Sequence, residues 1–213
     1  MKLYYAPGGC SVGIHVLLEE IGIPHELQAL SMQAGDTRKP AFLAINPKGK
    51  VPTLLRDDGS VLTEYGAIAH WLARCHPDAQ LLPVDAQSEA RMHEVLDFCV
   101  GGIHKEGFTR IFRPAYYSPR AEDHDTVRKQ GREFIEQGFS LLGSALSQSE
   151  RWVISSYSIA DSALFYLELW SLHVGIALPD RLQTHLDNML ARPAVQRALR
   201  AEGQEIPPLR RPT

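Results

Sequence analysis

The sequence predicts a small α/β domain followed by an all-α domain. Over about the first 75 residues, short apolar runs alternate with stretches of helical apolar spacing, in the order β-α-β-α-β-β-α. The proline-containing stretch "CHPDAQLLPVDAQ" at 75–87 reads as a linker, and strand signals stop after it. We therefore expect an α/β domain over residues 1–76 and a helical domain over residues 86–205.

Turn and capping residues set the elements of the first domain. Gly22 is placed to end a helix, and Asp57-Asp58-Gly59 lies between two apolar runs, which is typical of a hairpin. Thr63 is the expected N-cap of the last helix, whose apolar stripe includes Cys75. The expected order is a strand at 2–6, a helix at 11–22, a strand at 25–30, a short helix or turn at 39–47, a hairpin at 51–64 and a helix ending near 75.

The second half reads as helices only. "SIAD" at 158–161 matches a capping box, in which Ser158 and Asp161 satisfy each other's backbone amides. The mostly apolar stretch after it predicts a buried central helix. The expected helices are an apolar stripe at 92–99, a long segment at 123–148, the buried helix at 158–174 and a short helix at 191–203, before an irregular proline-rich tail.

Composition excludes several classes of protein. The net charge is −3 over 213 residues with acids and bases interspersed, so we expect no nucleic-acid partner. No apolar run approaches the ~20 residues of a membrane span, so no membrane partner is expected. Three widely spaced cysteines argue against a disulfide framework and fit a cytoplasmic location. No Cys/His group has zinc-ligand spacing, so no metal site is expected.

One thiol stands where a strand gives way to a helix. In "APGGCSVG", Cys10 follows a glycine turn and opens the helix, and that position lowers the pKa of a thiol. Gly13 occupies the place of a second cysteine, so a C-x-x-C disulfide is excluded. The alternative is an inert buried cysteine, since cysteine is often buried.

Six fragments, in order and at matching spacings, resemble cytosolic glutathione transferases, most closely the bacterial beta class. They are "YYAPGGCS" at 4–11, "FLAINPKGKVPTL" at 42–54, "LTEYGAIAHWLA" at 62–73, "IHKEGFTRIFRP" at 103–114, "SIADSALF" at 158–165 and "RPAVQRAL" at 192–199. The resemblance implies a thioredoxin-like domain that binds glutathione and a helical domain that holds a small hydrophobic electrophile. It also implies a homodimer, with glutathione as cosubstrate and no permanently bound cofactor.

Glutathione requires a strand edge for its backbone, a helix start for a carboxylate and a group that stabilises its thiolate. Val51-Pro52 is the candidate edge, since a peptide can pair with exposed main-chain groups. From the residues alone this is an ordinary trans X–Pro bond, but the resemblance implies a cis proline. The resemblance also assigns Glu64 to the ammonium and Tyr65 to the carboxylate of the glutamyl group, while from the residues alone Glu64 simply complements a helix dipole. Tyr65 departs from the small residue of the family, and its ring is expected to narrow the pocket.

Around the thiol, the resemblance implies Cys10, Ser11 and His104 as catalytic residues and places Lys105 and Asp97 among the glutathione contacts. From the residues alone, His104 would be a surface or packing residue. Asp97 stands where the family tends to carry an amide. A carboxylate cannot donate a hydrogen bond and would repel a glutathione carboxylate unless it met the ammonium instead. Gly101 and Gly102, next to His104, indicate either close helix packing or room for an electrophile. In the loop at 31–39, the candidates for a basic contact are Arg38 and Lys39.

Three functions remain open. The first is a glutathione transferase that conjugates the glutathione thiol to small hydrophobic electrophiles. The second is a glutathione-dependent disulfide reductase in which Cys10 is the nucleophile. The third is a non-catalytic ligand-binding or regulatory protein on the same fold.

Overall fold

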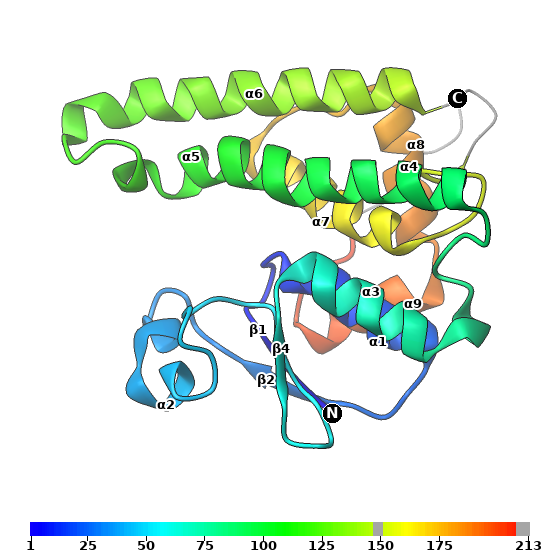
Figure 1. Cartoon of the computed structure of the whole chain (residues 1–213). Helices are drawn as coiled ribbons and strands as arrows, with labels where there is room; N and C mark the ends of the chain where they lie inside the picture. The colour runs from blue at the N-terminus through cyan, green and yellow to red at the C-terminus, as the bar shows by residue number, and fades with distance from the viewer. Residues whose placement is uncertain (147–150, 208–213) are drawn as a thin grey trace. The chain divides into compact units, whose positions relative to one another are not determined.

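The computed structural model describes residues 1–146 and 151–207 and divides them into two units (Figure 1). The first unit is Met1–Leu82 together with the chain from Asp187 onward, and the second, the helical unit, is Pro83–Leu186. The linker expected from the prolines therefore contains the division point. The last helix, by contrast, groups with the first unit, whereas the sequence assigns it to the helical domain.

A four-stranded mixed sheet organises the first unit, in the strand order β2-β1-β3-β4. Strands β1 and β2 are parallel, while β3 is antiparallel to both β1 and β4. This confirms the predicted β-α-β-α-β-β-α order and the thioredoxin-like fold. The elements are β1 (Lys2–Tyr5), α1 (Ser11–Ile21), β2 (Glu26–Ala29), α2 (Pro40–Leu43), β3 (Thr53–Leu55), β4 (Val61–Thr63) and α3 (Tyr65–Cys75).

Alternate residues of β1 face different helices. The Tyr5 ring lies 6.1 Å from the His15 ring of α1, and the Tyr4 ring lies 5.7 Å from the Phe42 ring of α2. Because successive strand residues point to opposite faces, α1 and α2 lie on opposite sides of the sheet. Figure 1 shows α1 beside α3 and α2 apart from both.

The C-terminal helix α9 (Pro193–Ala201) packs against α1, which explains its place in the first unit (Figure 1). Arg192 Nη2 donates to Glu20 Oε2 at 2.9 Å, and Arg197 Nε donates to Glu19 Oε2 at 2.6 Å. An apolar face of α9 is buried as well. These contacts link residues more than 170 positions apart in the sequence, so local periodicity could not reveal them.

Thr63 is not the N-cap of α3, contrary to the sequence prediction. It is the last residue of β4 and pairs with Thr53 of β3. Strand β4 therefore includes Thr63, and Glu64, one residue later, takes the N-cap position with a φ of 73°.

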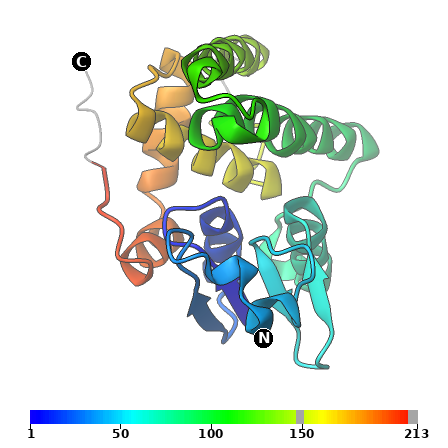
Figure 2. The ribbon, with the colours of Figure 1, turned by 90° about the vertical axis from the view of Figure 1, so that its left-hand side faces the viewer.

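The helical unit consists of α4 (Ala86–Asp97), the wide-turn π-helical segment η3 (Phe98–Phe108), α5 (Thr109–Phe112), α6 (His124–Ala145), α7 (Ile159–Val174) and the beginning of α8 (Asp180–Leu190). Helix α8 was not predicted from the sequence. Four buried residues show the missed spacing, namely Leu182, Leu186, Met189 and Leu190. Helix α6 agrees with the expected long segment up to residue 145, and the end of that segment at 148 lies outside the described residues. Figure 2 shows this unit from a second side.

Glycines let η3 and α6 approach closely, but they are not the pair singled out in the sequence. A Cβ added to Gly131 would lie 2.7 Å from the Gly107 carbonyl oxygen, and one added to Gly138 would lie 2.8 Å from Ile103 Cγ1. Gly101 would meet nothing within 4 Å among the described residues, and Gly102 would meet only Phe98 of its own segment. Helix packing therefore does not account for Gly101 and Gly102.

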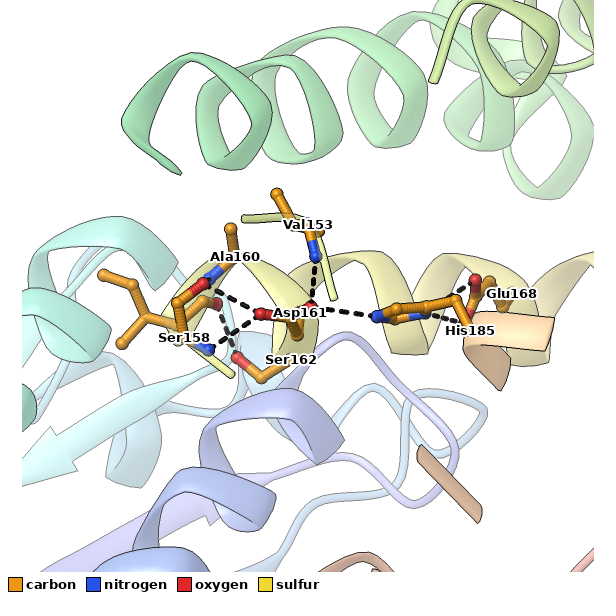
Figure 3. Close-up of polar contacts among 8 residues, drawn as sticks. Val153, Ser158, Ala160, Asp161, Ser162, Glu168 and His185 are labelled. Carbon is orange, nitrogen blue, oxygen red and sulfur yellow. Dashed lines mark hydrogen bonds and ion pairs between the residues drawn. The ribbon is translucent and has the colours of Figure 1, made fainter. Parts of the chain in front are cut away.

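A buried polar network fixes the start of α7 (Figure 3). Ser158 is the N-cap, and Asp161 Oδ2 accepts the Ser158 amide at 2.7 Å, which confirms the capping box. Asp161 Oδ1 also lies 3.1 Å from Nε2 of His185, whose Nδ1 lies 2.9 Å from Glu168 Oε1. Burial opposes a charged imidazole, but the neighbouring carboxylates outweigh this effect and raise the pKa of His185 to about 10.

None of the described helices is both long and apolar enough to cross a lipid bilayer.

The raised pKa of His185 predicts a pH dependence of stability. An unfolded histidine titrates near ~6.5, so the stabilisation is complete below that pH and is lost as the pH rises through about 10. The free energy of unfolding, measured by urea denaturation, should fall between pH 7 and 10. In His185→Gln it should be lower at pH 7 and change less with pH. Replacement of exposed His173 by Gln is the control, and wild-type and His185→Gln curves of equal slope would contradict the assignment.

Candidate functional site

The turn before α1 holds Cys10 at the helix N-terminus. The Gly9 amide donates to the Ala6 carbonyl at 2.8 Å, and a Cβ on Gly9 would come within 3.0 Å of that oxygen. Gly8 has a φ of 68°, a conformation that favours glycine. Cys10 is the N-cap of α1 and half-buried, so its sulfur stands at the positive end of the helix dipole.

Ser11 holds this turn rather than facing outward. It is fully buried, and its Oγ accepts the Ala6 amide at 3.1 Å and lies 3.4 Å from the Ala6 carbonyl oxygen. The hydroxyl thus bonds both backbone groups of the residue that follows β1. This geometry gives Ser11 a structural role in placing Cys10.

The main chain at Val51 lies beside the Cys10 thiol. The Val51–Pro52 peptide bond is cis, and Cys10 Sγ lies 3.6 Å from the Val51 carbonyl oxygen. Asn46 braces the loop that carries this bond, because its Nδ2 donates to the Lys50 carbonyl at 2.9 Å and to Thr53 Oγ1 at 2.8 Å. A main-chain segment with a fixed course thus lies beside the thiol.

Glu64 and Tyr65 stand at the start of α3. Glu64 is exposed, and its positive φ of 73° costs a non-glycine residue on the order of 1–3 kcal/mol. Such backbone outliers concentrate at functional sites. Tyr65 is the first residue of α3, and its side chain is buried, with 4% of the residue exposed. The ring therefore has little surface with which to narrow an open pocket.

Lys48 is a basic residue that the sequence analysis did not consider. Its Nζ lies 2.6 Å from Glu64 Oε1 and 2.9 Å from Thr63 Oγ1. The two basic residues expected from the sequence are Arg38 and Lys39. Lys39 Nζ donates to Asp36 Oδ1 at 2.6 Å. Arg38 lies near Gly49, because a Cβ added to Gly49 would be 3.2 Å from Arg38 Nη1. The signal for Lys48 was its place in "NPKGKVP", between the loop and the cis proline.

The remaining expected residues belong to the helical unit. Asp97 is exposed at the end of α4, and His104 and Lys105 lie on η3. The Nδ1 of His104 lies 3.2 Å from the hydroxyl of Tyr166, and its ring meets the Trp170 ring edge-on at 4.8 Å. Two residues of α7 therefore orient this imidazole. Extended π-helical segments such as η3 are rare and often mark functional sites.

The three thiols differ in exposure. Cys99 is fully buried, and burial, with the charges of Glu168 and Asp161, holds the pKa of its thiol well above the usual range. Cys75 is exposed, contrary to the expectation from its position on an apolar stripe, because it is the last residue of α3. Burial therefore makes the Cys99 thiol less reactive than the Cys10 thiol, but it does not protect the thiol of Cys75.

Comparison with known proteins identifies the family. Residues 9–75 match the family model for the glutathione S-transferase N-terminal domain. The chain is 38% identical over 212 residues to glutathione S-transferase GstA of Escherichia coli O157:H7, covering 95% of this chain and 99% of that protein. The chain belongs to the glutathione S-transferase family. Its class of activity is accordingly that of a glutathione S-transferase.

Solved structures agree with this assignment. A beta class glutathione S-transferase of Sphingomonas chungbukensis is 32% identical with a TM-score of 0.83, over 96% of this chain and all of that one. A glutathione transferase homologue from Sulfitobacter, solved with bound glutathione, is 26% identical with a TM-score of 0.89, over 96% and 98% of the two chains. The resemblance to bacterial beta class enzymes is thus confirmed.

The exposures predict the order in which the thiols react. In the native protein, a thiol reagent such as Ellman's reagent should modify Cys10 and Cys75, and Cys99 should react only after unfolding, since the thiolate is the reactive form. Cys75→Ser should leave one reactive thiol per native chain. Peptide mapping that found Cys99 modified in the native protein would contradict this order.

Proposed function

We propose that the chain binds glutathione along the first unit, with the tripeptide thiol beside Cys10. The observation that carries the proposal is the 3.6 Å contact between Cys10 Sγ and the carbonyl oxygen of Val51, next to the cis proline. The main chain at Val51 would pair with the cysteinyl backbone of glutathione. Pro52 would hold that carbonyl in place.

The glutamyl end would lie at the start of α3. Amides in the first turn of a helix attract a carboxylate, and Tyr65 supplies such an amide. In the protein alone, the Glu64 carboxylate pairs with Lys48. When glutathione binds, this carboxylate would accept a hydrogen bond from the ammonium group, either in place of Lys48 or together with it. Because both side chains are more than half exposed, that ion pair is worth at most ~1 kcal/mol and is readily exchanged.

Conjugation is the reaction we assign first. The N-terminus of α1 would stabilise the glutathione thiolate, whose sulfur then attacks an electrophilic carbon of a small hydrophobic substrate and displaces its leaving group. Glutathione is thus a cosubstrate, and the helical unit would supply the substrate site. The thiol loses its proton to solvent before attack. From the family resemblance we propose His104 as a catalytic residue and Lys105 as a glutathione contact. Ser11 is assigned to the turn, and Asp97 remains a proposed contact.

Disulfide reduction is the second candidate, and the position of Cys10 favours it. The Cys10 thiolate would attack a disulfide, release one thiol and form a mixed disulfide with the other half. One glutathione thiolate would then displace that half as the second thiol and leave glutathione on Cys10, and a second glutathione thiolate would release the Cys10 thiolate. The electrons come from two glutathione molecules, which leave as one oxidised glutathione. Because Gly13 replaces the second cysteine of a C-x-x-C motif, resolution within the chain is excluded at that position. Tyr65 and Asp97, which depart from the family pattern, are the residues that favour a non-catalytic role, and the 38% identity to a named glutathione S-transferase argues against it.

Two further expectations are carried as proposals, a homodimer and a cytoplasmic location. The aromatic stretch after η3 includes exposed Phe112 and Tyr116, which are candidates for an interface. The odd number of cysteines fits a reducing compartment. A role in detoxification is proposed from the family assignment alone.

Glu64 can be tested by calorimetry. Loss of a charge-assisted hydrogen bond costs ~1.5–3 kcal/mol, so Glu64→Ala should weaken glutathione binding by ~10–150-fold. Lys48→Met should leave the affinity unchanged or raise it slightly, because it removes a competitor for Glu64. Exposed Glu205→Ala in the same unit is the control. Unchanged affinity in Glu64→Ala would remove Glu64 from the site.

Substitution of Cys10 tests whether conjugation and disulfide reduction both depend on its thiol. In a Cys75→Ser background, oxidised glutathione should add one tripeptide per chain, on Cys10. Cys10→Ser should abolish reduction of mixed disulfides. If it also lowers conjugation of halonitroaromatic compounds by orders of magnitude, Cys10 serves both reactions, and if conjugation persists, the helix N-terminus suffices. Disulfide reduction that survives Cys10→Ser would exclude the second candidate.

Light scattering tests the dimer. We expect a particle of twice the 23.8 kDa mass of one chain at micromolar concentration. A stable mass of one chain would contradict the proposal.

A further inference from the structure

We propose that the first unit binds one divalent metal ion of the Zn²⁺ class between His15, Glu19 and His25. One ligand atom from each of the three side chains lies within 4.8 Å of the other two, and Glu19 Oε1 lies 4.0 Å from His15 Nε2 and 3.7 Å from His25 Nε2. His15 and Glu19 are one turn apart on α1 and share a face, and His25 follows the end of that helix. Because this spacing differs from the usual zinc motifs, no metal site was predicted from the sequence.

In both histidines, Nε2 is the ring nitrogen that is available to bind a metal ion. His15 Nδ1 lies 3.0 Å from Glu202 Oε1, and His25 Nδ1 lies 2.9 Å from the Ile23 carbonyl oxygen. A carboxylate and a carbonyl oxygen both accept hydrogen bonds, so in each neutral ring the proton sits on Nδ1 and Nε2 keeps a lone pair. This is the outer-shell arrangement that orients metal-binding histidines in proteins.

The Nε2 atom of His15 lacks a partner that the protein could supply. The side chain is fully buried, and Nε2 has no hydrogen-bond partner among the described residues. The Oε1 atom of Glu19 lies 4.0 Å away, which is too far for a hydrogen bond. A buried polar atom without a partner costs ~1–3 kcal/mol, so a ligand at this position would remove a penalty.

Charge and access also suit a cation. Arg197 holds Oε2 of Glu19 at 2.6 Å, which leaves Oε1 facing His25 Nε2 at 3.7 Å. With neutral histidines, the two carboxylates of Glu19 and Glu202 outweigh the one guanidinium of Arg197, and a net negative charge remains. The side chains of Glu19 and His25 are 20% and 9% exposed, which gives an ion a path from solvent.

The donor set selects the class of metal. Imidazole suits Zn²⁺, Cu²⁺, Fe²⁺ and Ni²⁺, and two imidazoles with one carboxylate leave a fourth tetrahedral position for water. With metal–ligand bonds of ~2.0–2.1 Å, the ligand atoms must draw together by roughly 1 Å, which rotation of the Glu19 and His25 side chains can supply. Hard ions such as Mg²⁺ prefer sites built only from oxygen.

Titration of the full-length, tag-free protein with Zn²⁺ and Co²⁺ tests the proposal. We expect one equivalent to bind, and Co²⁺ should give the visible spectrum of a tetrahedral nitrogen and oxygen site, without a sulfur-to-cobalt charge-transfer band. His25→Gln and Glu19→Gln should each lower the affinity at least ~10-fold. His25 is chosen over His15 because it lies at the rim, where substitution leaves the core intact. His173→Gln is the matched control and should bind as the wild type does.

Three results would overturn the proposal. They are the lack of stoichiometric binding by the wild-type protein, equal affinity in wild type and His25→Gln, and a sulfur charge-transfer band that places the ion on a cysteine. Circular dichroism of each variant establishes that it is folded before its affinity is compared. None of these measurements involves glutathione, so their outcome is independent of the proposed enzymatic function.

Discussion

The buried carboxylate of Glu202 joins the parts of the first unit on which the thiol site depends. Its Oε1 lies 3.0 Å from His15 Nδ1 on α1, and its Oε2 accepts the Gly8 amide at 3.2 Å in the turn before Cys10. Both side chains of the Glu202–His15 pair are fully buried. Removing His15 would leave the buried Glu202 carboxylate without this partner, and loss of a hydrogen bond to a charged group typically costs ~1.5–3 kcal/mol. The C-terminal segment is therefore part of the structure that positions Cys10.

A second buried network has the same function in the helical unit. Asp161 and Glu168 hold His185 from two positions on α7, and the capping box fixes where that helix begins. The same helix carries Tyr166 and Trp170, which contact His104. In each unit, then, a buried histidine–carboxylate pair fixes a helix, and the helix carries or orients a residue expected to be functional.

Local patterns predicted most of the fold. Periodicity and turn residues predicted the β-α-β-α-β-β-α order, the hairpin and the capping box, because each depends on neighbours within a few positions. The same reasoning missed α8, and it placed the N-cap at Thr63 because it could not see the pairing of Thr63 with Thr53. The packing of α9 on α1 depends on ion pairs between distant segments, such as Arg192 with Glu20, which no local pattern encodes.

Less of the candidate site than of the fold could be predicted from the residues alone. The turn before Cys10 could be predicted from its glycines, whereas the cis bond at Pro52 and the role proposed for Glu64 came only from the family resemblance. Lys48 and the cluster at His15 were not predicted, since they depend on side chains meeting in three dimensions. The exposure of Cys75 was also predicted wrongly. Its position on the apolar stripe of α3 suggested burial, but Cys75 is the last residue of that helix and is exposed.

Hydrogen exchange at residues 6–13 measures the coupling of Glu202 to the thiol-bearing turn most directly. If Glu202 holds the turn, Glu202→Ala should accelerate amide exchange there, with the largest change at Gly8, whose amide loses its acceptor. Glu205→Ala, an exposed change three residues further along the chain, should leave exchange at 6–13 as in the wild type. Equal protection of residues 6–13 in Glu202→Ala and the wild type would contradict the account.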